Sequence, residues 1–315
     1  LSVNYTAPHS PWTGHPRDIV DSYDDCPFES CPQEEPHPWA IIPKETHPDE
    51  ADSTTLGLSD NLGNRESIKG YFAAVTAMDL DVGRIIDKIE TLGLRDNTLI
   101  VFAADNGYSC GHHGFWGKGN GTYPINMYEN SIKVPFVASH PGVIPSGMVQ
   151  SAMVASHDFL PTLLEYVNLP LPDTNLPGES FLPALKEEQT PGRDSVCIYD
   201  EYGYCRMIRT REWKYVHRYK DFANELYDLV NDPDERQNLA DDPAQADRIK
   251  EMREQMEAWF AKYVIPEKDG KTAHAGAGQN RPVGGKWEDG TDAFVYDYVM
   301  KKRAENEAEK EKEKK

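Results

Sequence analysis

Residues 98–122 read TLIVFAADNGYSCGHHGFWGKGNGT, and this stretch decides the fold. Its first part is an apolar run from Leu99 to Ala104 with no charge before Asp105, a pattern typical of a buried strand in a parallel sheet. An Asp-Asn-Gly turn ends the strand, and two histidines, a tryptophan, a lysine and several glycines follow. Ligands bind at the carboxyl ends of strands in open α/β sheets, so we predict a ligand site here.

A helix is predicted immediately before this strand. Apolar residues recur at helical spacing across residues 66–92, and Gly93 stands where a helix C-cap is expected. Two short turns then lead into the strand. Helix, turn and strand in this order form half of a βαβ unit, which predicts an α/β architecture.

The remaining chain divides into a larger first part and a smaller second part. We predict a main α/β domain at residues 1–168, a Pro-rich linker at 169–194, a subdomain of antiparallel sheet and helix at 195–265, and an extension with a charged tail at 266–315. Further strands are expected at residues 1–6, 134–139, 195–199, 205–210 and 214–219, with a last strand or turn at 225–229. Further helices are expected at 157–167 and 243–264.

Composition excludes two classes of partner. The 315 residues carry a formal net charge of -20 and no basic stripe, which argues against nucleic acid. No apolar run approaches the roughly 20 residues that span a bilayer. A small anionic substrate would need local positive charge, and residues 112–118 offer it at a strand end.

Four side chains are candidates for the site. Asp105 and Asn106 supply adjacent oxygen ligands, which suit Ca²⁺ or Mg²⁺, although Asp-Asn-Gly is also a common turn sequence. Lys118 lies between two glycines and can approach an oxyanion, but Gly119 stands where a P-loop requires Ser or Thr. His9 is flanked by prolines that forbid a helix, and it either points into a cleft or lies on the surface.

Six motifs occur in one order along the chain. They are APHSP at residues 7–11, YFAAVTAMD at 71–79, DNG at 105–107, GHHGFWGK at 111–118, VP at 134–135, and ELYDL at 225–229 with DP and NL after it. In this order the chain resembles the C-terminal half of a type I, formylglycine-dependent sulfatase of the alkaline phosphatase superfamily. The amino-acid sequence of residues 110–128 is most similar to that of bacterial sulfatases acting on sulfated polysaccharides.

The resemblance implies a fold and a set of roles. The fold would be the C-terminal part of an alkaline-phosphatase-like mixed sheet flanked by helices, with a small antiparallel sheet-and-helix subdomain. Asp105 and Asn106 would bind Ca²⁺ together with two N-terminal aspartates. Lys118 and His9 would contact the sulfate of a sulfated carbohydrate, His9 as general acid toward the leaving alcohol, and His113 would line the same pocket.

The chain departs from the family at the nucleophile. Formylglycine is made in a C/S-x-P-x-R motif, which is absent, because Cys26-Pro27 and Cys31-Pro32 place the proline wrongly. The chain also opens on Leu1 without an initiator methionine. We therefore expect a C-terminal portion that is inert alone, with the N-terminal half in the same precursor or another chain. The resemblance also implies a bacterial periplasmic or secreted location.

Two other functions and one covalent link stay open from the sequence. A phosphodiesterase or phosphonate hydrolase of the same superfamily is the nearest alternative, although such enzymes commonly carry Asp-His where Asn106 stands. A non-catalytic carbohydrate-binding or structural subunit is the other. Cys26 and Cys31 lie in a Pro-rich loop and form either a disulfide or free thiols.

Overall fold

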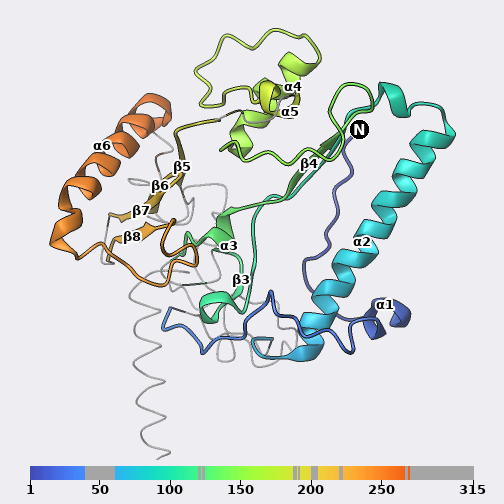
Figure 1. Ribbon diagram of the computed structural model, residues 1–315, viewed down its shortest axis with the longest axis horizontal. Helices are drawn as coiled ribbons and strands as arrows, with labels where there is room; N and C mark the ends of the chain where they lie inside the picture. Colours follow the sequence, from blue (N-terminus) through green and yellow to red (C-terminus); the bar gives the residue numbers. More distant parts are fainter. Residues whose placement is uncertain are drawn as a thin grey trace, which may run out of the picture. The chain divides into compact units, whose positions relative to one another are not determined.

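The computed structural model shows two compact units (Figure 1). The first unit comprises Leu1–Ala152, Phe159–Leu169 and Ser180–Gly192, and the second Met153–Asp158, Pro170–Glu179 and Arg193–Lys315. The structure describes residues 1–39, 61–119, 122, 125–186, 190, 192–199, 205–219, 223–266 and 269. The predicted extension at 266–315 lies almost entirely outside the described residues. The predicted domain boundaries stay a prediction.

The long helix α2 (Arg65–Thr91) confirms the helix predicted before the central strand. The side chain of Asn64 accepts hydrogen bonds from the backbone N–H groups of Glu66 and Ser67, which caps the first turn. Gly93 follows the last turn with φ 68°, a left-handed conformation that glycine adopts without strain. Capping at both ends explains why the predicted bounds agree with the observed ones.

The central strand β1 (Ile100–Ala103) lies where the apolar run predicts it, but its pairing differs from the prediction. It pairs antiparallel with β4 (Phe136–Ser139), with Ile100 opposite Ser139. Its side chains are half-buried or exposed. The expectation of a buried strand with parallel neighbours is therefore wrong for the described residues, because an apolar run indicates burial without indicating the direction of the neighbouring strand.

Shorter elements complete the first unit. They are α1 (Arg17–Asp21), β2 (Ser109–Cys110), β3 (Trp116–Gly117), α3 (Glu129–Ile132), α4 (Phe159–Tyr166) and α5 (Leu182–Lys186), with 3-10 turns η2 (Arg95–Asn97) and η3 (His112–Gly114). Strands β2 and β3 pair antiparallel and form a small ribbon. The strand predicted at residues 1–6 is wrong, because these residues take part in no strand pairing.

The second unit confirms the predicted meander. Its four strands pair antiparallel in chain order, as β5 (Ser195–Tyr199), β6 (Cys205–Thr210), β7 (Trp213–Arg218) and β8 (Glu225–Asp228). The unit also contains the 3-10 turns η5 (Ser156–Asp158) and η6 (Pro243–Gln245), and η6 leads into helix α6 (Ala246–Tyr263). One face of α6 packs on the sheet through Met252, Met256 and Phe260. None of the described helices is long and apolar enough to cross a bilayer.

Candidate functional site

The Asp-Asn-Gly turn presents two oxygen atoms at the end of β1. Asp105 Oδ1 accepts a hydrogen bond from the backbone N–H of Asn106 at 2.9 Å, and Asn106 Nδ2 donates to the carbonyl of Gly107 at 2.8 Å. The Asn106 amide nitrogen is thus used inside the turn, which leaves its Oδ1 as an acceptor for a ligand. Asp105 is exposed, whereas Asn106 is half-buried.

Gly107 holds this turn against α3. Its N–H donates to the carbonyl of Ser131 at 3.0 Å, and a Cβ at this position would lie 2.1 Å from the carbonyl oxygen of Asn130. Real Cβ atoms do not approach backbone oxygens so closely. Glycine is therefore required at position 107 by close approach, although the sequence shows it only as a common turn residue.

We expect Gly107→Ala to destabilise the protein by about 1–3 kcal/mol, because the backbone of residues 105–107 must move away from α3. A matched control is Gly83→Ala in α2, where a Cβ meets nothing within 4 Å and alanine favours the helix. Thermal unfolding of both variants measures the difference. Equal unfolding temperatures for the two variants would contradict the requirement at position 107.

Lys118 follows β3 and is half-buried. Among the described residues its ammonium makes no ion pair and no hydrogen bond. The adjacent Gly119 is held by Asn126, whose backbone N–H and Nδ2 both donate to the Gly119 carbonyl oxygen, at 3.0 and 3.2 Å. Asn126 Oδ1 in turn accepts from the Ser131 hydroxyl at 2.6 Å. The charge of Lys118 is therefore unmatched by the described residues, and the Gly119 next to it is held by Asn126.

His9 lies in a tight turn with an exposed ring. Its backbone N–H donates to the carbonyl of Thr6 at 2.9 Å, and its Nδ1 lies 2.9 Å from the carbonyl oxygen of Ser10. A carbonyl oxygen can only accept, so Nδ1 carries the proton in that contact. Nε2 is then the ring nitrogen that can take up or release a proton.

An aromatic cluster brings the three candidate segments together. The ring of Trp12 lies 5.4 Å from that of Trp116 and 6.2 Å from that of Tyr108, between ring centroids. Tyr108 also stacks on Tyr71 of α2 at 5.3 Å. Burial raises the pKa of both tyrosine hydroxyls, so they stay neutral and add no negative charge to the site.

Members of this cluster stand close in the chain to His9, Asn106 and Lys118. Trp12 donates from Nε1 to the carbonyl of Pro8 at 2.8 Å, immediately before His9. Tyr108 and Trp116 stand two residues from Asn106 and Lys118 respectively. Sequence reasoning missed this cluster, although an aromatic residue within three positions of each candidate was an available signal.

His113 lies in η3 with φ 55°, a left-handed conformation that is uncommon for a residue other than glycine. Its ring stacks on that of Tyr128, with centroids 3.8 Å apart and planes 12° apart. This stacking fixes the ring orientation next to Gly114. No hydrogen bond or ion pair joins the side chains of His9, Asp105 and Lys118 within the described part of the chain.

The described residues contain no group of three or more His, Cys, Asp or Glu side chains placed to hold a metal ion. Asp105 and Asn106 therefore offer two oxygen ligands, whereas Ca²⁺ takes about six to eight. Their hard oxygen chemistry fits Ca²⁺, for which they would be two of the ligands.

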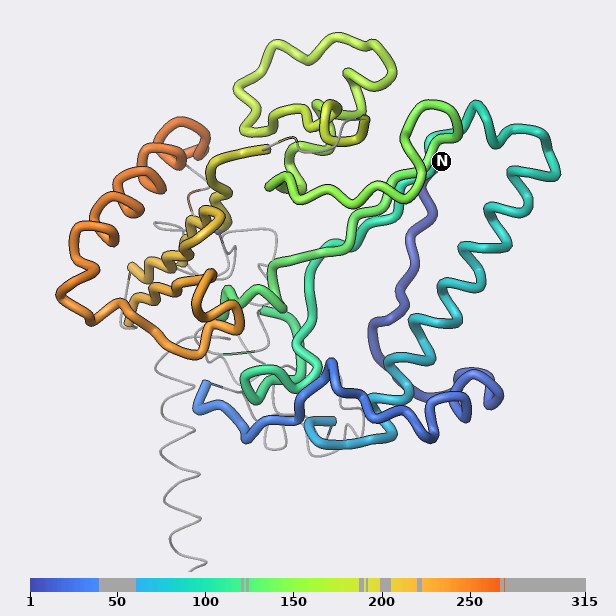
Figure 2. Tube along the Cα trace, in the orientation of Figure 1, coloured from blue at the N-terminus to red at the C-terminus, as the bar shows by residue number. Residues whose placement is uncertain are grey.

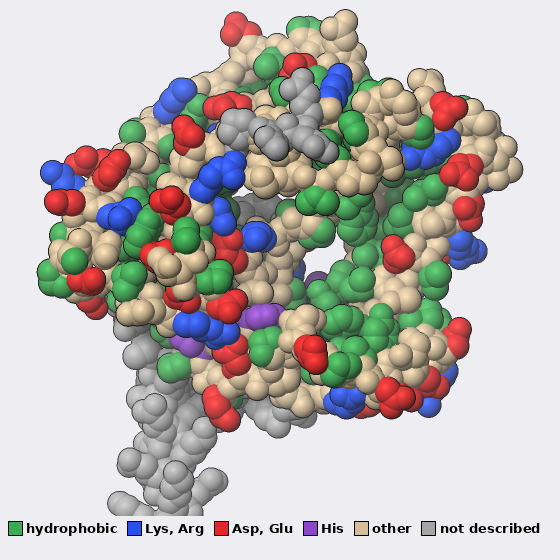
Figure 3. Space-filling model, in the orientation of Figure 1, with side chains coloured by type: hydrophobic (Ala, Val, Ile, Leu, Met, Phe, Trp, Pro, Cys, Tyr) green, Lys and Arg blue, Asp and Glu red, His purple; other side chains and the backbone are tan. Residues whose placement is uncertain are grey.

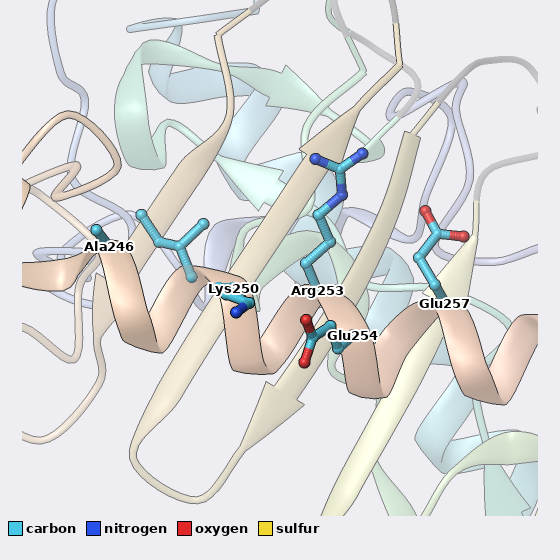
Figure 4. A pocket seen from close by; sticks show the side chains of 6 residues that line it. Ala246, Lys250, Arg253, Glu254 and Glu257 are labelled. Carbon is cyan, nitrogen blue, oxygen red and sulfur yellow. The ribbon is translucent and has the colours of Figure 1, made fainter.

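A shallow hollow elsewhere in the chain is lined by side chains from a single helix. Figure 4 shows that its lining side chains all stand on one helix, α6, and they are Ala246, Ile249, Lys250, Arg253, Glu254 and Glu257. Neighbouring side chains of one helix form a surface and do not enclose a ligand. We assign no function to it.

Two family models match the chain. Residues 2–169 match the family model described as sulfatase, and residues 111–262 match that of the C-terminal part of N-sulphoglucosamine sulphohydrolase. An N-acetylglucosamine-6-O-sulfatase from Bacteroides thetaiotaomicron is 30% identical over 218 residues, which are 66% of this chain and 38% of that protein.

Two solved structures are similar to the described chain. One, in complex with its substrate D-glucosamine-2-N,6-O-disulfate, is 29% identical with a TM-score of 0.58 over 66% of this chain and 42% of that one. The phosphonate monoester hydrolase of Agrobacterium radiobacter is 26% identical with a TM-score of 0.55 over 63% and 42%.

The chain spans less than half the length of each of these proteins. The matches confirm the expected α/β fold of the alkaline phosphatase type. Because the sulfatase model covers more than half of the 315 residues, the chain belongs to the sulfatase family.

Proposed function

We propose that this chain is the C-terminal portion of a sulfatase that hydrolyses sulfate esters of a carbohydrate. In this proposal Asp105 and Asn106 contribute to a Ca²⁺ site and Lys118 binds the sulfate. The nucleophile belongs to an N-terminal segment of the same precursor or of another chain. The observation that carries the proposal is the half-buried Lys118, whose charge has no partner among the described residues of a protein with net charge -20.

The chemistry of sulfuryl transfer needs the groups that this chain offers. Negative charge spreads over the sulfuryl oxygens in the transition state, and preorganised positive charge stabilises it. Lys118 would donate to one of these oxygens. Ca²⁺, when bound by Asp105 and Asn106 with further ligands, supplies positive charge at the same group. His9 would release a proton from Nε2 to the leaving alcohol oxygen.

Exposed apolar surface supports the proposal that part of the domain lies outside this chain. In α2 the fully buried residues lie between Ile68 and Ala74 only, and the apolar stripe that follows is half-exposed. Val137 of β4 is 59% exposed. Figure 3 shows hydrophobic side chains along the edge of α2 that turns toward the β1–β4 pair. A further layer of the sheet would cover such a stripe.

The substrate class rests on the relatives. This chain is similar to an N-acetylglucosamine-6-O-sulfatase and to a solved structure in complex with a glucosamine disulfate. We therefore propose a sulfated sugar as substrate. From the resemblance to bacterial polysaccharide sulfatases we also propose a periplasmic or secreted location.

The proposal is tested by assaying the isolated chain and the full-length protein on sulfated glucosamines, with and without chelator. We expect turnover by the full-length protein only, lost with chelator and restored by Ca²⁺. Turnover by the isolated chain would overturn the assignment of the nucleophile. Full activity in chelator would overturn the role of Asp105 and Asn106.

A phosphonate or phosphodiester hydrolase is the second candidate, favoured by the structural similarity to phosphonate monoester hydrolase. The same preparation distinguishes the two. Faster turnover of a phosphonate monoester with Mn²⁺ than of a sulfate ester with Ca²⁺ would establish the second candidate.

A further inference from the structure

Two cysteines that are far apart in the sequence meet in the first unit. All five cysteines are free thiols in this structure, so no bond joins Cys26 to Cys31, the pair considered from the sequence. Instead, the side chain of Cys31 lies in one buried cluster with that of Cys110 on β2, and each thiol shifts the pKa of the other. Both side chains are buried, at 8% and 6% exposure. The sequence could not indicate this pair, because 78 residues separate its members.

The backbones that carry the two thiols are fastened side by side. Gln33 Nε2 donates to the carbonyl of Cys31 at 2.8 Å and to the carbonyl of Cys110 at 2.9 Å, so one amide bridges both cysteines. The N–H of Glu34 donates to the carbonyl of Gly111 at 3.3 Å. Figure 2 shows the segment that ends at residue 39 running past the loop around residues 110–115.

The contact continues beyond the cysteines. A Cβ on Gly111 would lie 2.2 Å from the carbonyl oxygen of Pro32, and one on Gly114 would lie 2.0 Å from that of Glu35. The N–H of His37 donates to the carbonyl of Gly114 at 3.3 Å. Residues 31–37 and 110–114 therefore approach so closely that glycine is needed, and a disulfide requires neighbouring backbones of this kind.

We propose that Cys31 and Cys110 are the site of a disulfide that fastens residues 31–37 to the loop carrying His113 and Lys118. The oxidant is a low-molecular-weight disulfide. The Cys31 thiolate attacks one of its sulfurs and releases one thiolate. Cys110 then loses its proton, and its thiolate attacks Cys31 Sγ and displaces the second thiolate. The two protein thiols lose two protons and two electrons, and the disulfide becomes two thiols.

The surroundings of the two thiols determine which of them reacts first with the oxidant. The neighbouring Cys110 thiol stabilises the Cys31 thiolate and lowers the pKa of Cys31 to about 7. The neighbouring Cys31 thiol, together with burial, raises the pKa of Cys110. Cys31 is therefore the thiolate that reacts first near neutral pH, because the thiolate is the nucleophile in thiol–disulfide exchange.

The disulfide would make the backbone next to the candidate site more rigid. Cys110 stands next to Gly111, and its partner in the β2–β3 ribbon is Trp116, two residues before Lys118. A covalent bond here would limit opening of the ribbon in an oxidising compartment. The inference does not depend on the reaction that the site performs.

Peptide mapping of the full-length protein tests the proposal. The reduced protein is equilibrated with glutathione disulfide, remaining thiols are alkylated, and the protein is cleaved after glutamate without reduction. Cleavage at Glu29 separates Cys26 from Cys31. We expect a peptide pair joined through Cys31 and Cys110 that separates on reduction. Alkylation of both cysteines, or a link from Cys31 to Cys26, would overturn the proposal.

Matched variants add a second measurement. Thermal unfolding is compared between the oxidised and reduced forms of the wild type, Cys31→Ser and Cys26→Ser. We expect oxidation to raise the unfolding temperature of the wild type and Cys26→Ser and to leave that of Cys31→Ser unchanged. If Cys31→Ser does not fold, mapping of the wild type and Cys26→Ser decides the question. A wild type with equal unfolding temperatures in both states and no mapped link would end the proposal.

Discussion

Replacing Lys118 with alanine is expected to lower kcat/KM of the full-length protein for a sulfate ester by about 100- to 1,000-fold, the cost of removing one preorganised charge from a transition state. The side chain is half-buried and has no ion pair among the described residues, so its loss should leave the fold intact. Lys118→Arg keeps the charge and should recover part of the activity, because the guanidinium is wider than the ammonium.

The control for this prediction is Lys133→Ala. Lys133 is exposed and pairs with Glu129 one helical turn away at 3.7 Å, so its removal should change kcat/KM by less than about threefold. Steady-state kinetics on both variants, with circular dichroism to verify folding, gives the comparison. If Lys118→Ala retained activity similar to that of Lys133→Ala, Lys118 would not bind the sulfate.

Replacing Asp158 with asparagine is expected to destabilise the protein by about 3–5 kcal/mol, because it leaves the guanidinium of Arg193 without its buried counter-charge. Asp158 is 1% exposed. It accepts hydrogen bonds from Arg193 Nε and from the backbone N–H groups of Ala155 and Glu179, each at 2.8 Å. Arg193 Nη2 also donates to it. One carboxylate thus joins three separate segments of the second unit.

The matched control carries the same substitution on an exposed ion pair. Arg84 Nη1 lies 2.8 Å from Asp81 Oδ1 on the solvent side of α2. Asp81→Asn should therefore lower the free energy of unfolding by less than about 1 kcal/mol. Urea denaturation followed by circular dichroism measures both shifts in the midpoint. A similar shift for the two variants would mean that the buried network contributes no more than a surface pair.

Regular elements could be predicted because their causes are local. The stripe of α2 and the alternation of β5 to β8 are periodic in the sequence, and caps such as Asn64 and Gly93 mark their ends. The antiparallel pairing of β1 could not be predicted, because it depends on contacts with residues 136–139.

Some residues of the candidate site could be predicted from the sequence, and the contacts around them could not. Asp105, Asn106 and Lys118 are adjacent to a visible strand end, so the pattern of residue types indicated them. The packing of Trp12 on Trp116 and the meeting of Cys31 with Cys110 are contacts between distant segments, and neither leaves a periodic trace. The roles of the predicted residues stay predictions until the assays are made.

The aromatic cluster of Trp12, Tyr71, Tyr108 and Trp116 has a consequence for how such a protein can evolve. These side chains contact one another and stand beside the residues proposed to bind Ca²⁺ and sulfate, so the proposed chemistry would depend on a frame of aromatic side chains outside the proposed ligand set. Under the proposed function, substitutions around Tyr128 and His113 would then change the preferred sugar while this frame is inherited unchanged. Related proteins could then act on different sugars while they carry out the same proposed reaction.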